Sequence, residues 1–249
     1  MIFTIARYEI RSMFLSPLPW IILAVVQILL GYIFLAQVDS FFILQPRLLG
    51  LENTPGVTDL VIAPLFQLAA IILLMIMPLV TMRSIAEEKR NRTLTLLISS
   101  PLNMSDIVLG KFLGLLLFVL ILVSLLMLMP LSLYAGTELD TGKLFSIYIS
   151  MLLLLSSFAA IGLYLSSLTE NQTIAAVSTF GALLMLWIID WAGESINGGQ
   201  SVISYLSLLQ HQQKMMEGVF DSSDVAYYLL IIVGFLVLTI RQLDRERLL

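Results

Sequence analysis

The chain has 249 residues, of which 59% are hydrophobic and only 12% charged, with a formal net charge of -4. Soluble domains carry about 25% charged residues, so this composition indicates a protein embedded in a bilayer. Cysteine is absent and His211 is the single histidine, which excludes disulfides, thiol catalysis and a multi-histidine metal site within one chain. No basic stripe with interleaved aromatic residues is present, so we expect no nucleic-acid partner.

The first predicted element is an amphipathic helix over residues 1–16. Its spacing predicts a helix in the inner membrane interface, retained in the mature protein, with basic residues facing lipid headgroups. A frayed terminus is the alternative interpretation. The turn "SPLP" (Ser16–Pro19) then directs the chain into the membrane. The predicted apolar face carries Phe3, Ala6, Ile10, Met13 and Phe14, and the polar face carries Thr4, Arg7, Tyr8 and Arg11.

Six apolar runs follow, most of them near the length of ~20 residues that a spanning helix needs. Segments of alternating polarity typical of a β-barrel are absent. The sequence therefore predicts an all-α membrane protein that forms a single domain over residues 1–249. The last run is short, and Tyr227 and Tyr228 at its start fit an interfacial aromatic belt. The predicted spans are 18–38, 60–82, 112–135, 144–168, 172–192 and 225–240.

Lysine and arginine residues set the orientation, because cytoplasmic loops of membrane proteins are enriched in them. With both termini inside, the outer side holds only Arg47, Lys143 and Lys214. We therefore expect a multi-pass protein of the bacterial inner membrane with both termini in the cytoplasm. The inner side then holds Arg7, Arg11, Arg83, Lys89, Arg90, Arg92, Lys111, Arg241, Arg245 and Arg247.

The longest outer connection, residues 193–224, combines the flexible "GESINGGQ" with apolar residues at helical spacing. Long loops in compact proteins are usually functional. We expect one or two short helices here, lying on or dipping into the outer leaflet.

The spans contain few polar side chains, chiefly Gln27, Gln67, Ser156 and Ser157. Packing between helices is the favoured explanation, and a role in a translocation path is the alternative. We find no ionisable coupling site at mid-depth and no catalytic constellation. The outer "GTELDTGKL" departs from a nucleotide-binding loop in spacing and lacks its hydroxyl residue. A transport process would therefore need an external energy source.

The densest charge lies between the second and third spans, in "EEKRNRTLTLLISSP" (residues 87–101). The pattern predicts a helix over residues 83–98 with partly buried apolar side chains and charges directed elsewhere. Two interpretations are open. The charges belong to a solvated loop, or they form a docking surface, which the apolar "TLTLLI" favours because an exposed apolar face needs cover.

The run "R-x-I-A-E-E-K-R-x-x-T-L-x-L-L-x-x-S-P", followed by "DIVLGK", resembles the ABC-2 type exporter permeases. The resemblance implies a cytoplasmic coupling helix that docks on a separate ATPase subunit, which carries ATP and magnesium, so that this chain needs no cofactor or metal. It also implies an elbow helix at 1–16 and external helices within 193–224. The implied ATPase contacts are Arg83, Glu87, Glu88, Lys89, Arg90, Arg92, Thr93 and Leu94, with Thr169, Glu170, Asn171 and Gln172 in a second inner loop.

Within that family the segment Leu206–Leu229 is similar to the branch associated with gliding motility and copper-enzyme maturation. The matching positions are Ser207, Gly218, Asp224 and Tyr228. One position departs from the family pattern, because Arg92 stands where the family has glycine before threonine.

These observations favour the transmembrane subunit of an ABC exporter, without catalytic residues of its own. Six spans enclose little space, so a second permease copy or a paralogue is expected as partner, beside the lipid bilayer and a periplasmic or envelope protein. A non-transporting membrane scaffold and a lipid-modifying enzyme are the alternatives. Nothing in the sequence identifies the cargo.

Overall fold

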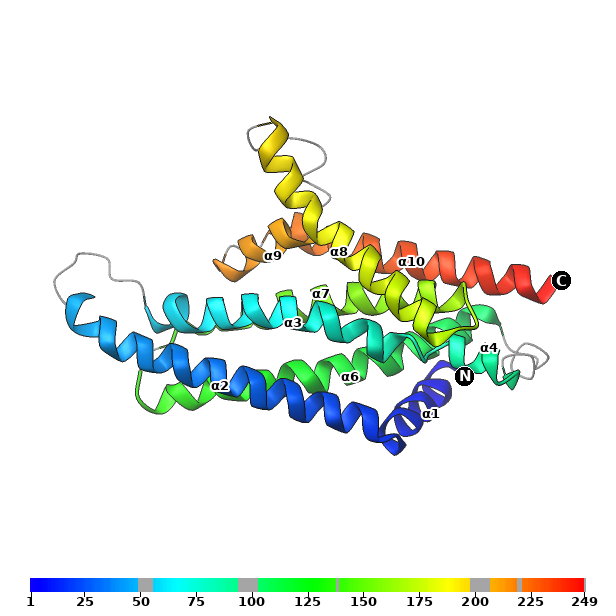
Figure 1. Ribbon diagram of the computed structural model, residues 1–249, viewed down its shortest axis with the longest axis horizontal. Helices are drawn as coiled ribbons and strands as arrows, with labels where there is room; N and C mark the ends of the chain where they lie inside the picture. Colours follow the sequence, from blue (N-terminus) through cyan, green and yellow to red (C-terminus); the bar gives the residue numbers. More distant parts are fainter. Residues whose placement is uncertain (49–55, 94–102, 138, 198–206, 219–220, 249) are drawn as a thin grey trace.

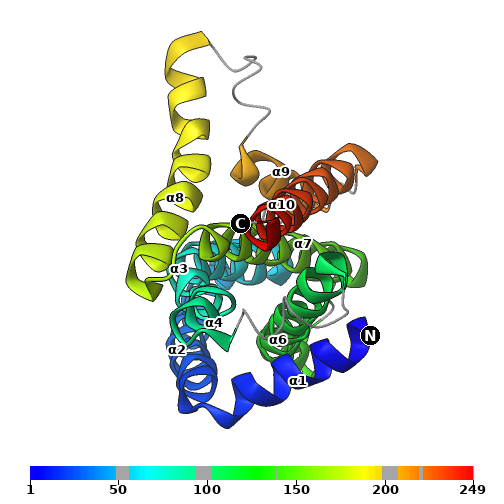
Figure 2. The ribbon, with the colours of Figure 1, turned by 90° about the vertical axis from the view of Figure 1, so that its right-hand side faces the viewer.

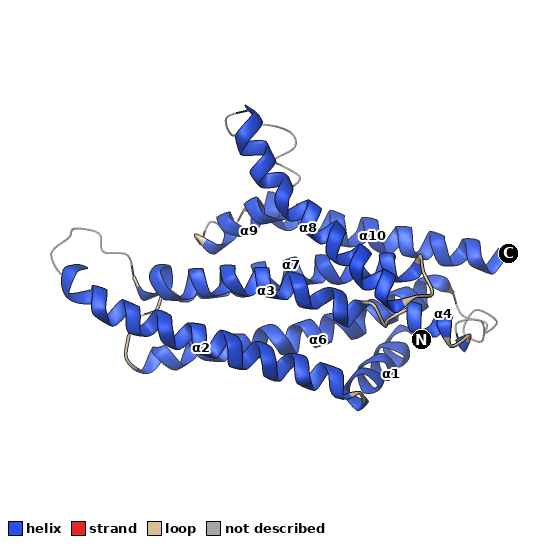
Figure 3. Cartoon of the chain, in the orientation of Figure 1, coloured by secondary structure: helices blue, strands red, loops and turns tan. Residues whose placement is uncertain are grey.

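The structure, a computed structural model, describes residues 1–48, 56–93, 103–137, 139–197, 207–218 and 221–248 (Figure 1). All regular structure in these residues is helical, which confirms the predicted all-α fold (Figure 3). The elements are α1 (Ile2–Leu15), α2 (Pro17–Leu48), the π-helical turn η1 (Thr58–Ile62), α3 (Ala63–Thr81), α4 (Ala86–Arg90), α6 (Met104–Ser132), the short 3-10 turn η2 (Leu133–Ala135), α7 (Thr141–Ser167), α8 (Gln172–Asn197), α9 (Leu208–Met216) and α10 (Ser222–Leu248).

The helix α7 is the centre of the bundle. It packs against α3, α6, α8, α9 and α10, and Figure 2 shows these long helices grouped around it. Its start is capped by Asp140, whose side chain accepts hydrogen bonds from the backbone N–H groups of Gly142 and Lys143. Gly162 allows a close approach to α3, because a Cβ there would collide with the side chain of Thr81.

Five helical stretches are long and apolar enough to cross a bilayer: Pro17–Gln45, Thr58–Arg90, Met104–Ser132, Thr141–Ser167 and Ser222–Arg247. The chain is therefore a multi-pass membrane protein. At the place of the fifth predicted span, α8 contributes a shorter apolar stretch, Gln172–Ile188. Figures 1 and 2 show α8 leaning away from the other helices, and its role as a sixth span stays a prediction.

The last predicted span, 225–240, is too short. The helix α10 has 27 residues and continues through the charged stretch up to Leu248, because arginine, glutamine, glutamate and leucine, which make up most of this stretch, are good helix formers. The first span is also longer than predicted, since α2 extends to Leu48.

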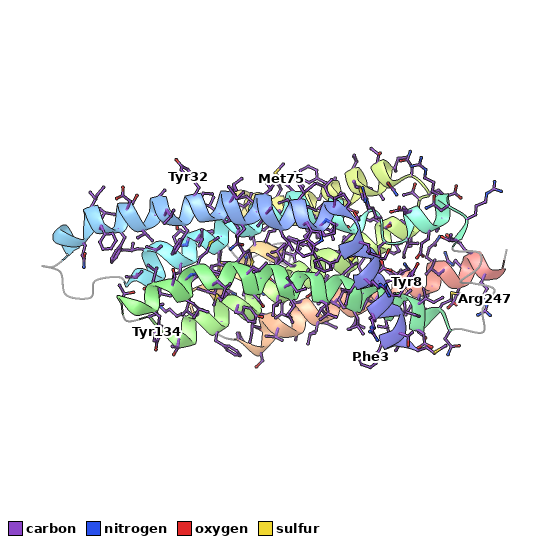
Figure 4. The ribbon with its side chains drawn as sticks, turned by 90° about the horizontal axis from the view of Figure 1, so that it is seen from below. Phe3, Tyr8, Tyr32, Met75, Tyr134 and Arg247 are labelled. Carbon is purple, nitrogen blue, oxygen red and sulfur yellow. The ribbon has the colours of Figure 1, made fainter. Side chains whose placement is uncertain are left out.

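Lipid-facing surfaces are recognisable from their exposed apolar side chains. Along α2, Ile28 is 74% exposed and Tyr32 is 76% exposed, and Figure 4 shows Tyr32 and Met75 at the outer edge of the bundle. Side chains this apolar and this exposed are typical of a helix that faces acyl chains rather than water.

A sharp corner joins α1 to α2 at Ser16. Its hydroxyl accepts a hydrogen bond from the N–H of Leu18 at 3.3 Å, and Pro17 is the first residue of α2, a position that proline favours. The indole N–H of Trp20 donates to the carbonyl of Phe14 at 2.9 Å and fixes the corner from the other side. As a result, α1 runs across the bundle axis (Figure 2).

Candidate functional site

The described part of the charged segment after α3 contains a turn followed by the short helix α4. Residues 82–85 are a turn, and α4 begins at Ala86 and ends at Arg90, so the predicted helix over 83–98 starts too early. The chain leaves the helical conformation at Arg92, whose φ of 57° is left-handed. Residues 94–98 of the predicted helix, with Leu94, lie outside the described residues.

The beginning of α4 is capped by a side chain from another helix. The hydroxyl of Ser166 in α7 accepts hydrogen bonds from the N–H groups of Ile85 and Ala86 at 3.2 and 3.0 Å, and it donates to the carbonyl of Met82. The first N–H groups of a helix have no partner within the helix. Ser166 therefore supplies the cap that the local sequence lacks and joins α4 to the centre of the bundle.

A buried ammonium group joins α4 to α1 and α6. Lys111 of α6 is 2% exposed, and its Nζ donates to Glu88 Oε1 at 2.6 Å, to Glu9 Oε2 at 3.2 Å and to the carbonyl of Ser84 at 2.9 Å. A buried charge is tolerated only when it is paired and hydrogen-bonded. Lys111 meets this condition with two carboxylates from two different segments.

A second ion pair joins α4 to the carboxyl-terminal helix. The Nζ of Lys89 contacts the carboxylate of Glu246 in α10 and the carbonyl of Ser167 in α7. Gln242 also donates to the same Glu246 oxygen at 3.2 Å. The five residues of α4 are thus connected to α1, α6, α7 and α10.

The residues of the first inner loop that are predicted to contact the ATPase differ in their exposure and in whether their charges are already paired. Arg83, Arg90, Arg92 and Thr93 are exposed, and Glu87 is half-buried. Glu88 and Lys89 are also half-buried, but their charges are already used in ion pairs within the chain. Whether any of these residues contacts an ATPase stays a prediction.

The second inner loop lies beside the first. The turn before α8 exposes Glu170 and Asn171, while Thr169 and Gln172 are half-buried. The side chain of Asn171 accepts from the N–H of Thr173 at 3.0 Å and caps α8. Since α4 contacts α8, the structure brings the two predicted contact loops together on one end of the bundle.

The amino-terminal helix α1 packs tightly on α6 through two glycines. A Cβ on Gly110 would lie 2.7 Å from Ile5 Cβ, and a Cβ on Gly114 would lie 2.8 Å from Glu9 Cγ. Glycines four residues apart are typical of close helix packing in membranes. The packed face of α1 contains Ala6 and Glu9, so this helix is anchored on protein as well as placed for lipid.

The residues predicted to lie in the membrane interface fall into an exposed group and a half-buried group. Phe3, Arg7 and Arg11 are exposed, whereas Ile10 and Phe14 are half-buried. Phe3, at 84% exposure, points away from the bundle (Figure 4). The face that packs on α6 contains Ala6 and Glu9, whereas Phe3 is left exposed, and the placement of these residues in the membrane interface stays a prediction.

Most of the four polar side chains in the spans are hydrogen-bonded to helix carbonyl groups, and a role in a translocation path stays a prediction. Ser156 and Ser157 are buried and donate to carbonyl groups one turn earlier in their own helix, at 2.6 and 3.0 Å. Gln27 donates to the carbonyl of Leu125 in α6 at 3.2 Å. Gln67 is exposed on α3. Three of the four residues therefore have partners in helices, and the geometry favours the packing role.

The helix α9, in the connection predicted to lie on the outer side, is held against the bundle by polar contacts. Ser207 caps α9, Tyr228 donates to the carbonyl of Leu208 at 2.8 Å, and the ring of His211 contacts Asp224 at 2.5 Å. Gly218, with a φ of 88°, follows its end. All four positions of the predicted branch resemblance therefore lie around α9.

The start of α10 lies just beyond α9. Hydrogen bonds from the backbone and side chain of Ser223 lower the pKa of the exposed Asp221. The lowered pKa keeps Asp221 ionised at the start of the helix, where a negative charge is favourable.

Sequence reasoning missed Glu9, Lys111 and Glu246 as parts of this site. The predicted third span begins at residue 112 and places Lys111 on the inner side without naming a partner for it, whereas Lys111 is buried within α6, which begins at Met104. A lone lysine inside an apolar helix requires a buried partner, and that signal was present in the sequence. The sequence does not predict which residue pairs with Lys111, because Glu9 is 102 positions away from it along the chain.

Comparison with known protein families matches residues 3–248 to the family described as ABC-2 family transporter protein. A search of curated proteins gave no match. The family match covers nearly the whole chain, and with it the charged segment, the second inner loop and α9.

Proposed function

Because the chain belongs to the ABC-2 family of transporter proteins, we propose that it is the permease subunit of an ABC exporter of the bacterial inner membrane. In this proposal ATP is hydrolysed on a separate cytoplasmic subunit, and this chain exports a substrate or transmits force across the membrane. Both termini lie in the cytoplasm, α1 is the elbow helix, and the segment 83–98, with α4 at its centre, is the coupling region.

The observation that carries the proposal is the set of connections of α4. A displacement of this short helix is transmitted to α1 and α6 through Lys111, and to α7 through Ser166. The ion pair of Lys89 and Glu246 transmits it to α10. A loop that served only to place positive charge in the cytoplasm would need none of these connections. A coupling element needs them, because rigid contacts turn a local displacement into movement of packed helices.

The charges that remain on the surface support a docking partner. Arg90 and Arg92 at the end of α4 are exposed and form no ion pair within the described residues. Glu170 is exposed in the neighbouring loop. Complementary charges set orientation and partner choice at interfaces, so we propose that these residues contact the ATPase while Glu88 and Lys89 act inside the chain.

A dimer of permeases, with a second copy or a paralogue, completes the proposed complex. One bundle of this size has its centre filled by α7, which is largely buried by its neighbours. A route for cargo is therefore expected between two bundles rather than within one.

The four positions around α9 support the proposal that the chain belongs to the gliding-motility and copper-enzyme-maturation branch. Their common location indicates that the resemblance follows one structural unit, the docking of α9 on α10. A periplasmic or envelope protein that binds near α9 is the matching partner. A membrane scaffold without transport remains the second candidate, and it requires the same α9 contact but no ATPase.

Co-expression with candidate ATPase subunits tests the function. We expect the pair Arg90→Glu and Arg92→Glu to abolish co-purification, because both charges face the partner. Lys89→Met should leave co-purification intact and lower the ATPase stimulation, because it breaks an internal link. Lys214→Glu is the control, because Lys214 is exposed on α9, which the proposal places on the periplasmic side.

Three results would contradict the proposal. One is unchanged ATPase binding in the double variant, and another is Lys89→Met with full stimulation. The third is a topology map with reporter fusions that places residues 87–92 outside the cell. If no ATPase subunit binds and an envelope protein does, the scaffold is the function.

A further inference from the structure

A cavity of about 380 Å³ lies between α1, the start of α2 and the segment that contains α4. Its lining includes the apolar residues Leu18, Val80 and Leu115 and the charged residues Glu9, Arg83, Glu87 and Glu88. A cavity lined by both apolar and charged side chains suits an amphiphilic molecule.

Two of these charges have opposite signs and remain unpaired. Arg83 and Glu87 form no ion pair within the described residues, and the guanidinium of Arg83 has only a long 3.5 Å contact with the hydroxyl of Ser16. Side chains of opposite charge four positions apart can pair on a helix, but residues 82–85 form a turn and the two side chains are not paired. The cavity wall thus presents one free cation and one free anion.

A third group lacks a hydrogen-bond donor. Glu88 uses Oε1 for Lys111, and its Oε2 is buried without a partner among the described residues. Buried acceptors without donors are costly. A cation bound at the adjacent Glu87 would stabilise the Glu88 carboxylate electrostatically.

We propose that the cavity binds the headgroup of an inner-leaflet phospholipid with a primary amine, phosphatidylethanolamine. The phosphate pairs with Arg83, whose guanidinium suits phosphate oxygens. The ammonium group donates to Glu87, and the glycerol and first acyl carbons contact the apolar lining residues. Phosphatidylcholine fits less well, because its quaternary ammonium has no hydrogen to donate.

The location selects a lipid over a soluble zwitterion. The cavity is lined by Tyr8, Ser12 and Met13 of α1, the helix whose exposed Phe3 and Arg11 suit the membrane interface. Leu18 and Pro19 of α2 also line it, at the start of a helix with exposed apolar side chains. The inference rests on the membrane placement of α1 and not on ATPase docking.

Native mass spectrometry of the delipidated full-length chain tests this site without an ATPase. The probes are phosphatidylethanolamine, its N-methyl and N,N-dimethyl derivatives, phosphatidylcholine and phosphatidylglycerol, all with the same acyl chains. We expect one tightly retained ethanolamine lipid per chain, affinity that falls with each methyl group, and about tenfold weaker binding of phosphatidylcholine, the effect of losing charge-assisted hydrogen bonds.

Variants locate the site. Arg83→Gln and Glu87→Gln should each lose the retained lipid, whereas Arg11→Gln on α1 and Glu170→Gln in the second inner loop should keep it, because neither lines the cavity. Equal retention of phosphatidylcholine, or retention in both cavity variants, overturns the proposal. Displacement of the lipid by an equal concentration of glycerophosphoethanolamine would show that the cavity binds a soluble ligand, and it would overturn the proposal of a lipid site.

The methylation series uses the unmodified chain, so the test holds even if a variant fails to fold. The result is also separate from the proposed function. A chain that binds an ATPase but shows no headgroup preference refutes only the lipid site, and a chain with the preference but no ATPase partner refutes only the exporter.

Discussion

Removing the buried ammonium group of Lys111 is the most direct perturbation of the site. We predict that Lys111→Met strongly destabilises the protein, although methionine has a similar shape and suits an apolar helix. The lysine is 2% exposed and neutralises Glu9 and Glu88 at 3.2 and 2.6 Å. Without it, both carboxylates remain near each other in a largely buried position with no counter-charge.

The expected loss is about 3–5 kcal/mol, the range for breaking a buried ion pair from one side. The same reasoning predicts a rescue. The triple variant Lys111→Met, Glu9→Gln and Glu88→Gln removes all three charges, and neutral replacements of buried ion pairs are often as stable as the original. The triple variant should therefore regain most of the lost stability.

Unfolding of the full-length chain by SDS titration in mixed micelles, followed by circular dichroism, measures these differences. Arg11→Met is the control, because Arg11 is exposed on α1 without an ion pair, and it should change stability by less than about 0.5 kcal/mol. If Lys111→Met is as stable as the control, or the triple variant is less stable than the single one, the cluster does not hold α1, α4 and α6 together.

Two further predictions concern the backbone around the same site. Arg92→Gly should stabilise the protein by about 1 kcal/mol, because glycine adopts a φ of 57° without strain. Arg90→Gly at the end of α4 should destabilise it by a similar amount. A loss of stability in both variants would contradict the left-handed conformation at residue 92. Gly114→Ala should cost about 1–3 kcal/mol by pushing Glu9 and α1 away from α6, while Gly234→Ala, with open space around it, should be neutral or slightly stabilising in the same titration. Equal effects of the two alanines would show that α1 is loosely packed.

The sequence alone determined the class of the protein and most of its helices. Apolar runs near the length of a bilayer leave few choices for the backbone, since every N–H and C=O in the membrane must be bonded within a helix. Five of the predicted spans correspond to helices of spanning length, and the break at Ser16 followed from serine and proline chemistry. The charged motif between the second and third spans also carried the family resemblance, which the family match supports. Local composition was sufficient for these conclusions, because the length of an apolar run and the chemistry of a turn depend only on residues close together along the chain.

Only the tertiary structure decided which charges in that motif face inward. Glu88, Lys89, Arg90 and Arg92 lie within five residues of one another, and all four are charged. Glu88 and Lys89 are nevertheless paired within the chain, whereas Arg90 and Arg92 are exposed. Their partners could not be predicted, because Lys89 and Glu246 are 157 positions apart. The left-handed turn at Arg92 and the glycine contacts of α1 depend on the same long-range packing. Ion pairs and close contacts are set by distances in space, and a sequence pattern reports only distances along the chain.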